Sequence, residues 1–278
     1  HILLDSLQKI CLMHGMEVDY YKKLFQTIGN IIELIEKDDI PKYLLFLENA
    51  FPYMDNYNYH KGMNGIIQEL TELLKTKNIG TDSDRALLLD FQATLETKPE
   101  KAIKLEKDAL AQIETITADN ARLVSNLHAN LGGLYRMNGH PDLAREHMEK
   151  SISLLDQFNL LHINDSIPQI ANYAMFLTEQ QEPERGISEL QKLSGIIKEY
   201  HSDECLDYAK VQETLATIYL MTANLSHAKT HFKKAFKIYE KILADEPEMI
   251  EAKYLEIQEL YPQIGFSIGK TLSGLLTK

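Results

Sequence analysis

The sequence has few of the residues that interrupt helices. Its 278 residues include only 13 glycines and 8 prolines, most of them at the ends of long amphipathic stretches. No run of alternating valine, isoleucine and threonine competes with the helical periodicity. Because 44% of the residues are hydrophobic, the chain can bury a sizeable core. The sequence therefore predicts an all-α protein.

Positive charge is also scarce. Lysine and arginine together number 29, against 41 aspartates and glutamates, and the net charge is -12. Binding to nucleic acids depends largely on the neutralisation of phosphates by basic side chains. We therefore expect no DNA or RNA partner, whereas a basic peptide or protein would be attracted to the acidic surface.

Cysteines and long apolar runs are nearly absent. Cys11 and Cys205 lie far apart without metal-ligand spacing, which is typical of a reducing compartment. No signal peptide opens the chain, and no apolar run approaches the roughly 20 residues that span a bilayer. We expect a cytoplasmic protein without a membrane partner. Since the chain begins at His1 and not at methionine, we expect a fragment of a longer protein.

An internal repeat is the main feature that is present. Four segments align without gaps and start 42 residues apart, at residues 83, 125, 167 and 209. The seventh position of each segment is large: Leu89, Leu131, Tyr173 and Leu215. The eighth and twentieth positions are mostly small: Asp90, Gly132, Ala174 and Ala216, then Ala102, Ala144, Gly186 and Ala228. The first segment departs from the pattern, because Asp90 and Glu106 occupy sites that are small or apolar in the other three.

Small residues at two fixed positions allow two antiparallel helices to cross closely, with bulky neighbours in the flanking grooves. Pro141 and Pro183 follow the expected turns, where proline suits the first turn of the second helix. The pattern resembles the tetratricopeptide repeat, and the period of 42 exceeds the usual one of about 34 by about two helical turns. Long repeats of this kind are similar to those of kinesin light chains and of bacterial regulators. The resemblance implies a right-handed α-α superhelix, a solenoid of helix pairs.

The repeat divides the chain into four parts. We expect an N-terminal helical segment at residues 1–39, a divergent helix pair at 40–82, four repeats at 83–250 and closing helices at 251–278. The His-x-Leu-Leu opening at residues 1–4 is similar to the sequence that follows the nucleotide-binding part of NB-ARC-type NTPases. That resemblance implies the C-terminal sensor region of a bacterial regulator. The alternative is that His1 marks only an arbitrary start.

Two motifs that suggest chemistry do not meet its requirements. Residues 265–271 have glycines at Gly265 and Gly269 before Lys270, but a phosphate-binding loop needs four residues between its glycines and follows a strand. His227 and His231 have a chelating spacing but no third ligand nearby, and we interpret them as a solvent-exposed helical pair. No nucleophile has a plausible base. The sequence predicts neither an enzyme nor a metal or other cofactor.

The inner face of the array provides the candidate binding site. The resemblance places the second, fifth, sixth, ninth, twelfth and thirteenth positions of each first helix there, and tetratricopeptide proteins that bind extended peptides use asparagine at the sixth. An asparagine amide can donate to and accept from a peptide backbone. The alternative is that these asparagines contribute only solubility. The candidate groove residues are Asn126, Asn130, Gly133, Arg136, Met137, Asn172, Met175, Glu179 and Thr217.

The sequence therefore predicts a scaffold or sensor domain that binds a protein or peptide in its groove. A second hypothesis is a peptide-pheromone receptor domain of a bacterial transcriptional regulator. A DNA-binding domain ahead of the fragment would favour that second hypothesis, and a nucleotide-binding domain would favour the NTPase. A third hypothesis, an enzyme with a cryptic groove site, lacks a convergent acid, base and nucleophile.

Overall fold

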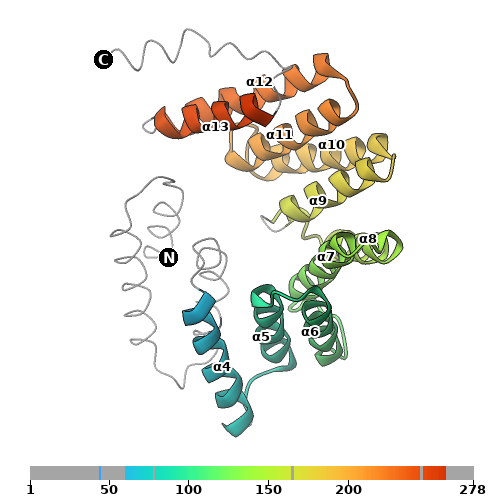
Figure 1. Ribbon diagram of the computed structural model, residues 1–278, viewed down its shortest axis with the longest axis vertical. Coiled ribbons are helices and arrows are strands. Elements are labelled where there is room, and N and C mark those ends of the chain that lie inside the picture. The colour runs from blue at the N-terminus through green and yellow to red at the C-terminus, as the bar shows by residue number, and fades with distance from the viewer. Residues whose placement is uncertain (1–43, 45–59, 78, 164–165, 245–246, 261–278) are drawn as a thin grey trace. The chain divides into compact units, whose positions relative to one another are not determined.

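The computed structural model describes residues 44, 60–77, 79–163, 166–244 and 247–260, and the regular structure in these ranges is α-helical (Figure 1). The expected segment at 1–39, Cys11, and the glycine-containing loop at 265–271 lie outside the described residues, as do most of residues 40–59 and the end of the 251–278 segment. The helices are α4 His60–Lys77, α5 Asp82–Leu95, α6 Pro99–Gln112, α7 Ala121–Met137, α8 Pro141–Gln157, α9 Ser166–Glu179, α10 Pro183–Tyr200, α11 Leu206–Met221, α12 Leu225–Ile242 and α13 Pro247–Leu260. None of them is both long and apolar enough to cross a membrane.

The chain divides into two compact units, His1–Leu123 and Val124–Lys278. In the first unit, α4 packs on α5 and α5 on α6. A capping box starts α5, because the Thr81 hydroxyl accepts from the Asp84 backbone N–H while the Asp84 carboxylate accepts from the Thr81 N–H. Asp90 and Glu106, which break the sequence pattern, are 9% and 1% exposed. The first repeat therefore forms a packed helix pair that includes two buried carboxyl groups.

In the second unit, each helix packs on the next from α8 to α13, and α9 also contacts α11. First helices α7, α9 and α11 alternate with second helices α8, α10 and α12. The largest fully buried side chains of this unit come from both sets: Leu127, Leu131, Leu155, Phe176, Leu177, Leu190, Leu193 and Phe232. After the last pair, Tyr254 of α13 stacks on Phe236 of α12 with ring centroids 4.0 Å apart. The predicted solenoid of paired helices is confirmed.

Close backbone approach explains the recurrent small residues. A Cβ atom added at Gly186 of α10 would lie 2.6 Å from the carbonyl oxygen of Ala174 in α9. One added at Gly132 of α7 would lie 2.6 Å from Met148 Cγ and 3.3 Å from the Ala144 carbonyl oxygen in α8. These glycines belong to the predicted pairs of eighth and twentieth positions. At Gly186 the close contact is with backbone, and at Gly132 it is first with the Met148 side chain and then with the backbone of α8.

The turns inside the pairs share one geometry. The fifteenth position of the last three repeats has a positive φ: 72° at Gly139, 64° at Gln181 and 59° at Ala223. The next residue in each case donates its N–H to a carbonyl five residues earlier, at 2.9, 2.8 and 2.7 Å, which is the main bond of a Schellman motif. Pro141 and Pro183 stand in the first turn of the following helix, as predicted.

Candidate functional site

A cavity of about 220 Å³ lies between α7, α8 and α9 in the second unit. Two first helices and one second helix contribute its walls: Ala129, Gly133, Arg136, Met137, Met148, Ser151, Gln169 and Asn172. Four of these, Gly133, Arg136, Met137 and Asn172, belong to the candidate groove residues. Met148, Ser151 and Gln169 were not predicted.

Two adjacent glycines of α7 have opposite roles. Gly132 faces α8, where an added Cβ would meet Met148, whereas a Cβ added at Gly133 would meet no atom within 4 Å. Gly133 thus leaves open space beside Ala129 at a point where most residues would place a side chain. This absence of a side chain helps to form the cavity.

A partly buried polar network supports one wall. Gln169 Oε1 accepts from Ser151 Oγ at 2.6 Å and from Ser125 Oγ at 2.9 Å, and Gln169 Nε2 donates to Asn126 Oδ1 at 2.6 Å. Both serines are at most 1% exposed. Because buried polar groups need hydrogen-bond partners, this network holds α7, α8 and α9 in one arrangement. Asn126, a predicted ligand contact, is one of its members.

Arg136 and Glu179 pair with each other. Arg136 Nε donates to Glu179 Oε2 at 2.8 Å, and Arg136 Nη2 donates to Glu179 Oε1. The pair connects the twelfth position of the second repeat with the thirteenth of the third. Since a bidentate pair of this kind neutralises both groups, the rim of the cavity presents a fixed ion pair and not a free guanidinium.

The other predicted residues do not line this cavity. Asn130 is exposed on α7, and Met175 of α9 is half-buried against the hydrophobic core. The Thr217 hydroxyl donates to the Glu213 carbonyl oxygen of its own helix at 3.1 Å. Met137, in contrast, is one of the lining residues, and because it is 78% exposed it leaves a large apolar side chain at the cavity mouth. The structure thus brings the second and third repeats together at one site and leaves Thr217 of the fourth outside it.

Histidines occupy equivalent places between the helices of two repeats. His128 and His147 approach through their Nδ1 atoms at 2.8 Å, and His231 Nδ1 lies 2.8 Å from Gln212 Oε1 at the same repeat positions. Burial lowers the pKa of His128 to about 4, with His147 and then Lys150 adding to the effect. Burial also lowers the pKa of His231 to about 4. The interpretation of His227 and His231 as a solvent-exposed pair is wrong for His231, which is half-buried and stacks on Tyr219.

No group of three or more histidine, cysteine, aspartate or glutamate side chains is arranged to hold a metal ion within the residues that the structure describes. Cys205 caps the N-terminus of α11. Its sulfur accepts from the Tyr208 N–H at the start of α11.

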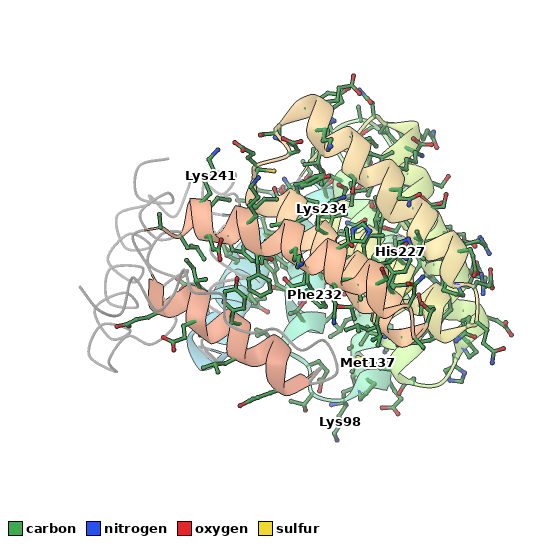
Figure 2. The ribbon with its side chains drawn as sticks, turned by 90° about the horizontal axis from the view of Figure 1, so that it is seen from above. Lys98, Met137, His227, Phe232, Lys234 and Lys241 are labelled. Atoms are coloured by element: carbon green, nitrogen blue, oxygen red, sulfur yellow. The ribbon has the colours of Figure 1, made fainter. Side chains whose placement is uncertain are left out.

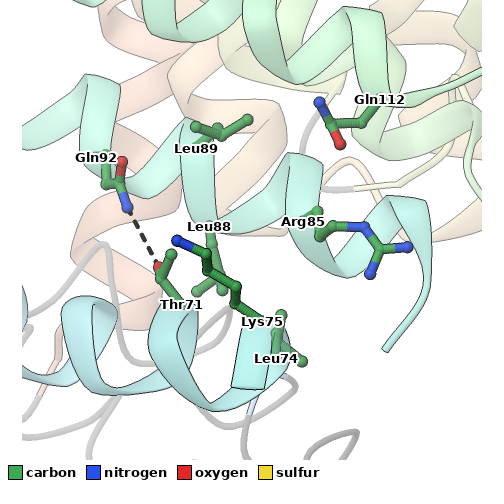
Figure 3. Close-up of a pocket in the computed structure, with 8 residues that line it drawn as sticks. All are labelled: Thr71, Leu74, Lys75, Arg85, Leu88, Leu89, Gln92 and Gln112. Carbon is green, nitrogen blue, oxygen red and sulfur yellow. Dashed lines mark hydrogen bonds between the residues drawn. The ribbon is translucent and has the colours of Figure 1, made fainter. Parts of the chain in front are cut away.

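A second cavity, of about 470 Å³, lies within the first unit (Figure 3). Leu74, Leu88 and Leu89 supply its apolar surface, and its polar lining is Thr71, Lys75, Arg85, Gln92 and Gln112. Arg85 is already paired with Asp82 at 2.8 Å. Such a lining suits a ligand with an apolar body and a polar end. The repeat pattern did not indicate this cavity, because the cavity lies between the divergent pair and the first repeat, where the repeat signature is weakest.

Comparison with known families shows that residues 166–241, which comprise α9 to α12, match the tetratricopeptide repeat family. The fold is a tetratricopeptide-repeat solenoid. No curated protein sequence matches the chain significantly. Tetratricopeptide-repeat domains are generally non-enzymatic scaffolds that bind proteins or peptides.

Solved structures share the fold at low sequence identity. BtubC (BKLC) from P. vanneervenii is 15% identical with a TM-score of 0.55, over 78% of this chain and 91% of that one. A putative kinesin light chain from Podosopora anserina, with nearly identical tetratricopeptide-like repeats, is 15% identical with a TM-score of 0.57, over 71% and 94%. A Rap protein complexed with Competence and Sporulation Factor is 15% identical with a TM-score of 0.54, over 95% and 75%. The resemblance to kinesin light chains thus extends to three-dimensional structure.

Proposed function

We propose that this tetratricopeptide-repeat domain binds an extended peptide or partner segment across α7 and α9, with one apolar side chain of the ligand in the cavity beside Gly133. The observation that carries the proposal is the open space at Gly133. It lies on the face where the repeat signature predicts ligand contacts, and Asn172 lies at its edge.

The residues that line the cavity support separate roles for an apolar pocket and a polar contact to the peptide backbone. Ala129, Gly133 and Met148 offer an apolar surface to a side chain. The exposed amide of Asn172 can pair with both polar groups of a peptide unit, whatever the sequence of the peptide. The Gln169 network keeps the three helices in register before binding, which reduces the entropy cost of forming the site.

The test is a selection of peptides from a random displayed library on the wild-type protein, followed by affinity measurements on variants. Gly133→Leu places a side chain in the cavity. If a ligand side chain occupies that space, its exclusion removes about 1.5–3 kcal/mol of burial, which corresponds to a roughly 10- to 100-fold rise in Kd. Asn172→Ala should weaken all selected peptides regardless of their sequence.

Gly195→Leu is the matched control. Gly195 is also a helical glycine with no atom within 4 Å of an added Cβ, but it lies on α10, away from the cavity. We expect this variant to bind like the wild type. Selected peptides that bind Gly133→Leu as tightly as Gly195→Leu would place recognition elsewhere and refute the proposal.

A second candidate function is a receptor domain for a short signalling peptide within a bacterial transcriptional regulator. The likeness to the Rap protein, which was solved with Competence and Sporulation Factor, covers 95% of this chain and favours the candidate at the level of fold. A receptor domain differs from a scaffold because its conformation must change when the peptide binds. Amide hydrogen exchange with and without a selected peptide tests this: protection confined to α7–α9 indicates a scaffold, and protection that spreads through the repeats to α12 indicates a receptor.

A further inference from the structure

The exposed face of α12 carries a stripe of lysines. Lys229, Lys233, Lys237 and Lys241 follow one another at intervals of four residues, and Lys234 lies beside them. All five are exposed, whereas the opposite face of the helix is buried through Ala228, Phe232, Ala235, Phe236 and Tyr239. Figure 2 shows Lys234 and Lys241 on α12 together with the buried Phe232. We call the five lysines the α12 stripe.

The stripe contrasts with the charge of the chain. Helix α12 holds five lysines and one glutamate, a net charge of +4 in 18 residues. The whole chain has a net charge of -12, so the other 260 residues carry -16. Helix α12 is thus a locally basic segment of a strongly acidic protein.

Neighbouring carboxylates do not account for the stripe. Lys241 pairs with Glu204. Lys229, Lys233, Lys234 and Lys237 have no ion pair with any residue in the described ranges. Lysines four residues apart on a helix repel one another, and among the five only Lys241, in the last turn, is favoured by the helix dipole. The arrangement is therefore unfavourable for the isolated fold, and a bound anionic partner would relieve it.

We propose that the α12 stripe binds an acidic segment of a partner protein, one polypeptide wide, with carboxylates spread along the helix. From Lys229 to Lys241 the stripe spans about 18 Å at 1.5 Å per residue, so four carboxylates on successive turns of a partner helix would match it. The site is separate from the cavity at α7–α9, and the proposal does not depend on the peptide-binding function.

Charge complementarity favours a narrow acidic segment over a broad polyanion. Interactions between exposed charges are screened beyond about 8 Å at physiological ionic strength. Because the other 260 residues carry a net charge of -16, a wider polyanion such as a membrane surface or a DNA duplex would be repelled more strongly than a narrow segment. A single acidic helix contacts the lysines and little else.

The experiment uses a fluorescein-labelled peptide, helical by design, with glutamates at every fourth position, and measures its anisotropy with the whole chain. The wild type should bind it with an affinity that falls as salt is raised. Lys233→Glu/Lys237→Glu should weaken binding at least 10-fold. The control Lys101→Glu/Lys104→Glu changes net charge equally on exposed positions of α6 and should change binding less than 2-fold.

Several results would overturn the proposal. They are equal losses in the two double variants, no binding of the peptide at low salt, or tighter binding to phosphatidylserine-containing vesicles or a 20-base-pair DNA duplex than to the peptide. The stripe variant also removes like-charge repulsion, so its melting temperature should equal or exceed that of the wild type. That measurement separates a loss of binding from a loss of folding.

Discussion

Gly186 is the most informative position for testing the packing of the helix pairs. In Gly186→Ala the added Cβ would lie 2.6 Å from the Ala174 carbonyl oxygen, and within 3.2 Å of the Ala174 Cα and carbonyl carbon. All three are backbone atoms, so no side chain can rotate away. The α9 and α10 helices must separate for the methyl group to fit.

The free-energy cost of this steric clash can be obtained by comparing two substitutions within the same helix. Gly195→Ala adds a methyl group to α10 where no atom lies within 4 Å, so only the helix propensity of alanine acts. That substitution should stabilise the protein by about 0.5–1 kcal/mol. Gly186→Ala has a similar gain, but overpacking in a close contact costs about 1–3 kcal/mol. The difference between the two variants therefore isolates the steric cost, which we expect to be about 1–3 kcal/mol.

The assay is urea unfolding followed by circular dichroism at 222 nm, with midpoints compared between variants. Both glycines lie in α10, so any loss of cooperativity along the repeats affects them alike. A parallel pair in α7 gives a second comparison. Gly133→Ala is unobstructed, and Gly132→Ala meets the flexible Met148 side chain before backbone. We expect the smaller penalty in α7. If Gly186→Ala and Gly195→Ala have the same midpoint, the close backbone contact inferred for α9 and α10 is wrong.

Four other substitutions give further tests. Burial lowers the pKa values of His128 and His231 to about 4, so the stabilising effect of the neutral histidines is complete above about pH 6.5 and is lost as pH falls from 6.5 towards 4. His128→Gln, which copies Gln212 of the fourth repeat, should make the melting temperature fall less steeply over this pH range. An unchanged slope would contradict the argument from burial. Gln181→Gly and Ala223→Gly relieve a positive φ of 64° and 59° and should each raise the unfolding free energy by up to about 1 kcal/mol, whereas a decrease would argue against the turn geometry. Gln169→Leu removes the acceptor shared by two buried hydroxyls and should cost about 1–3 kcal/mol in urea unfolding, and a neutral effect would show that the network does not hold the helices.

Much of the fold was predictable because it depends on a local rule applied repeatedly. The small residues at the eighth and twentieth positions predicted the contacts now seen at Gly132 and Gly186. The positions of Pro141 and Pro183 predicted helix starts. The packing of the first repeat was harder to predict, because Asp90 and Glu106 resemble surface residues in the sequence but are buried in the structure.

The candidate site was predicted only in part. The repeat register identified Gly133, Arg136, Met137 and Asn172, all of which line the cavity. It did not identify Gln169, whose contacts depend on the side-chain directions of three helices. It also treated Arg136 and Glu179 as separate contacts, whereas they form one ion pair across repeats. The net negative charge of the chain likewise gave no indication of the basic stripe on α12, because a net charge does not show where the positive side chains lie.

By itself, the sequence determined the class of fold, the period of the repeat and the positions where paired helices cross closely, because these follow from helical geometry and the sizes of neighbouring side chains. Only the tertiary structure decided which polar groups satisfy one another, and that the space at Gly133 remains open while Gly132 is packed. These properties arise from the positions of side chains on different helices or turns, and the order of residues along the chain does not specify those positions.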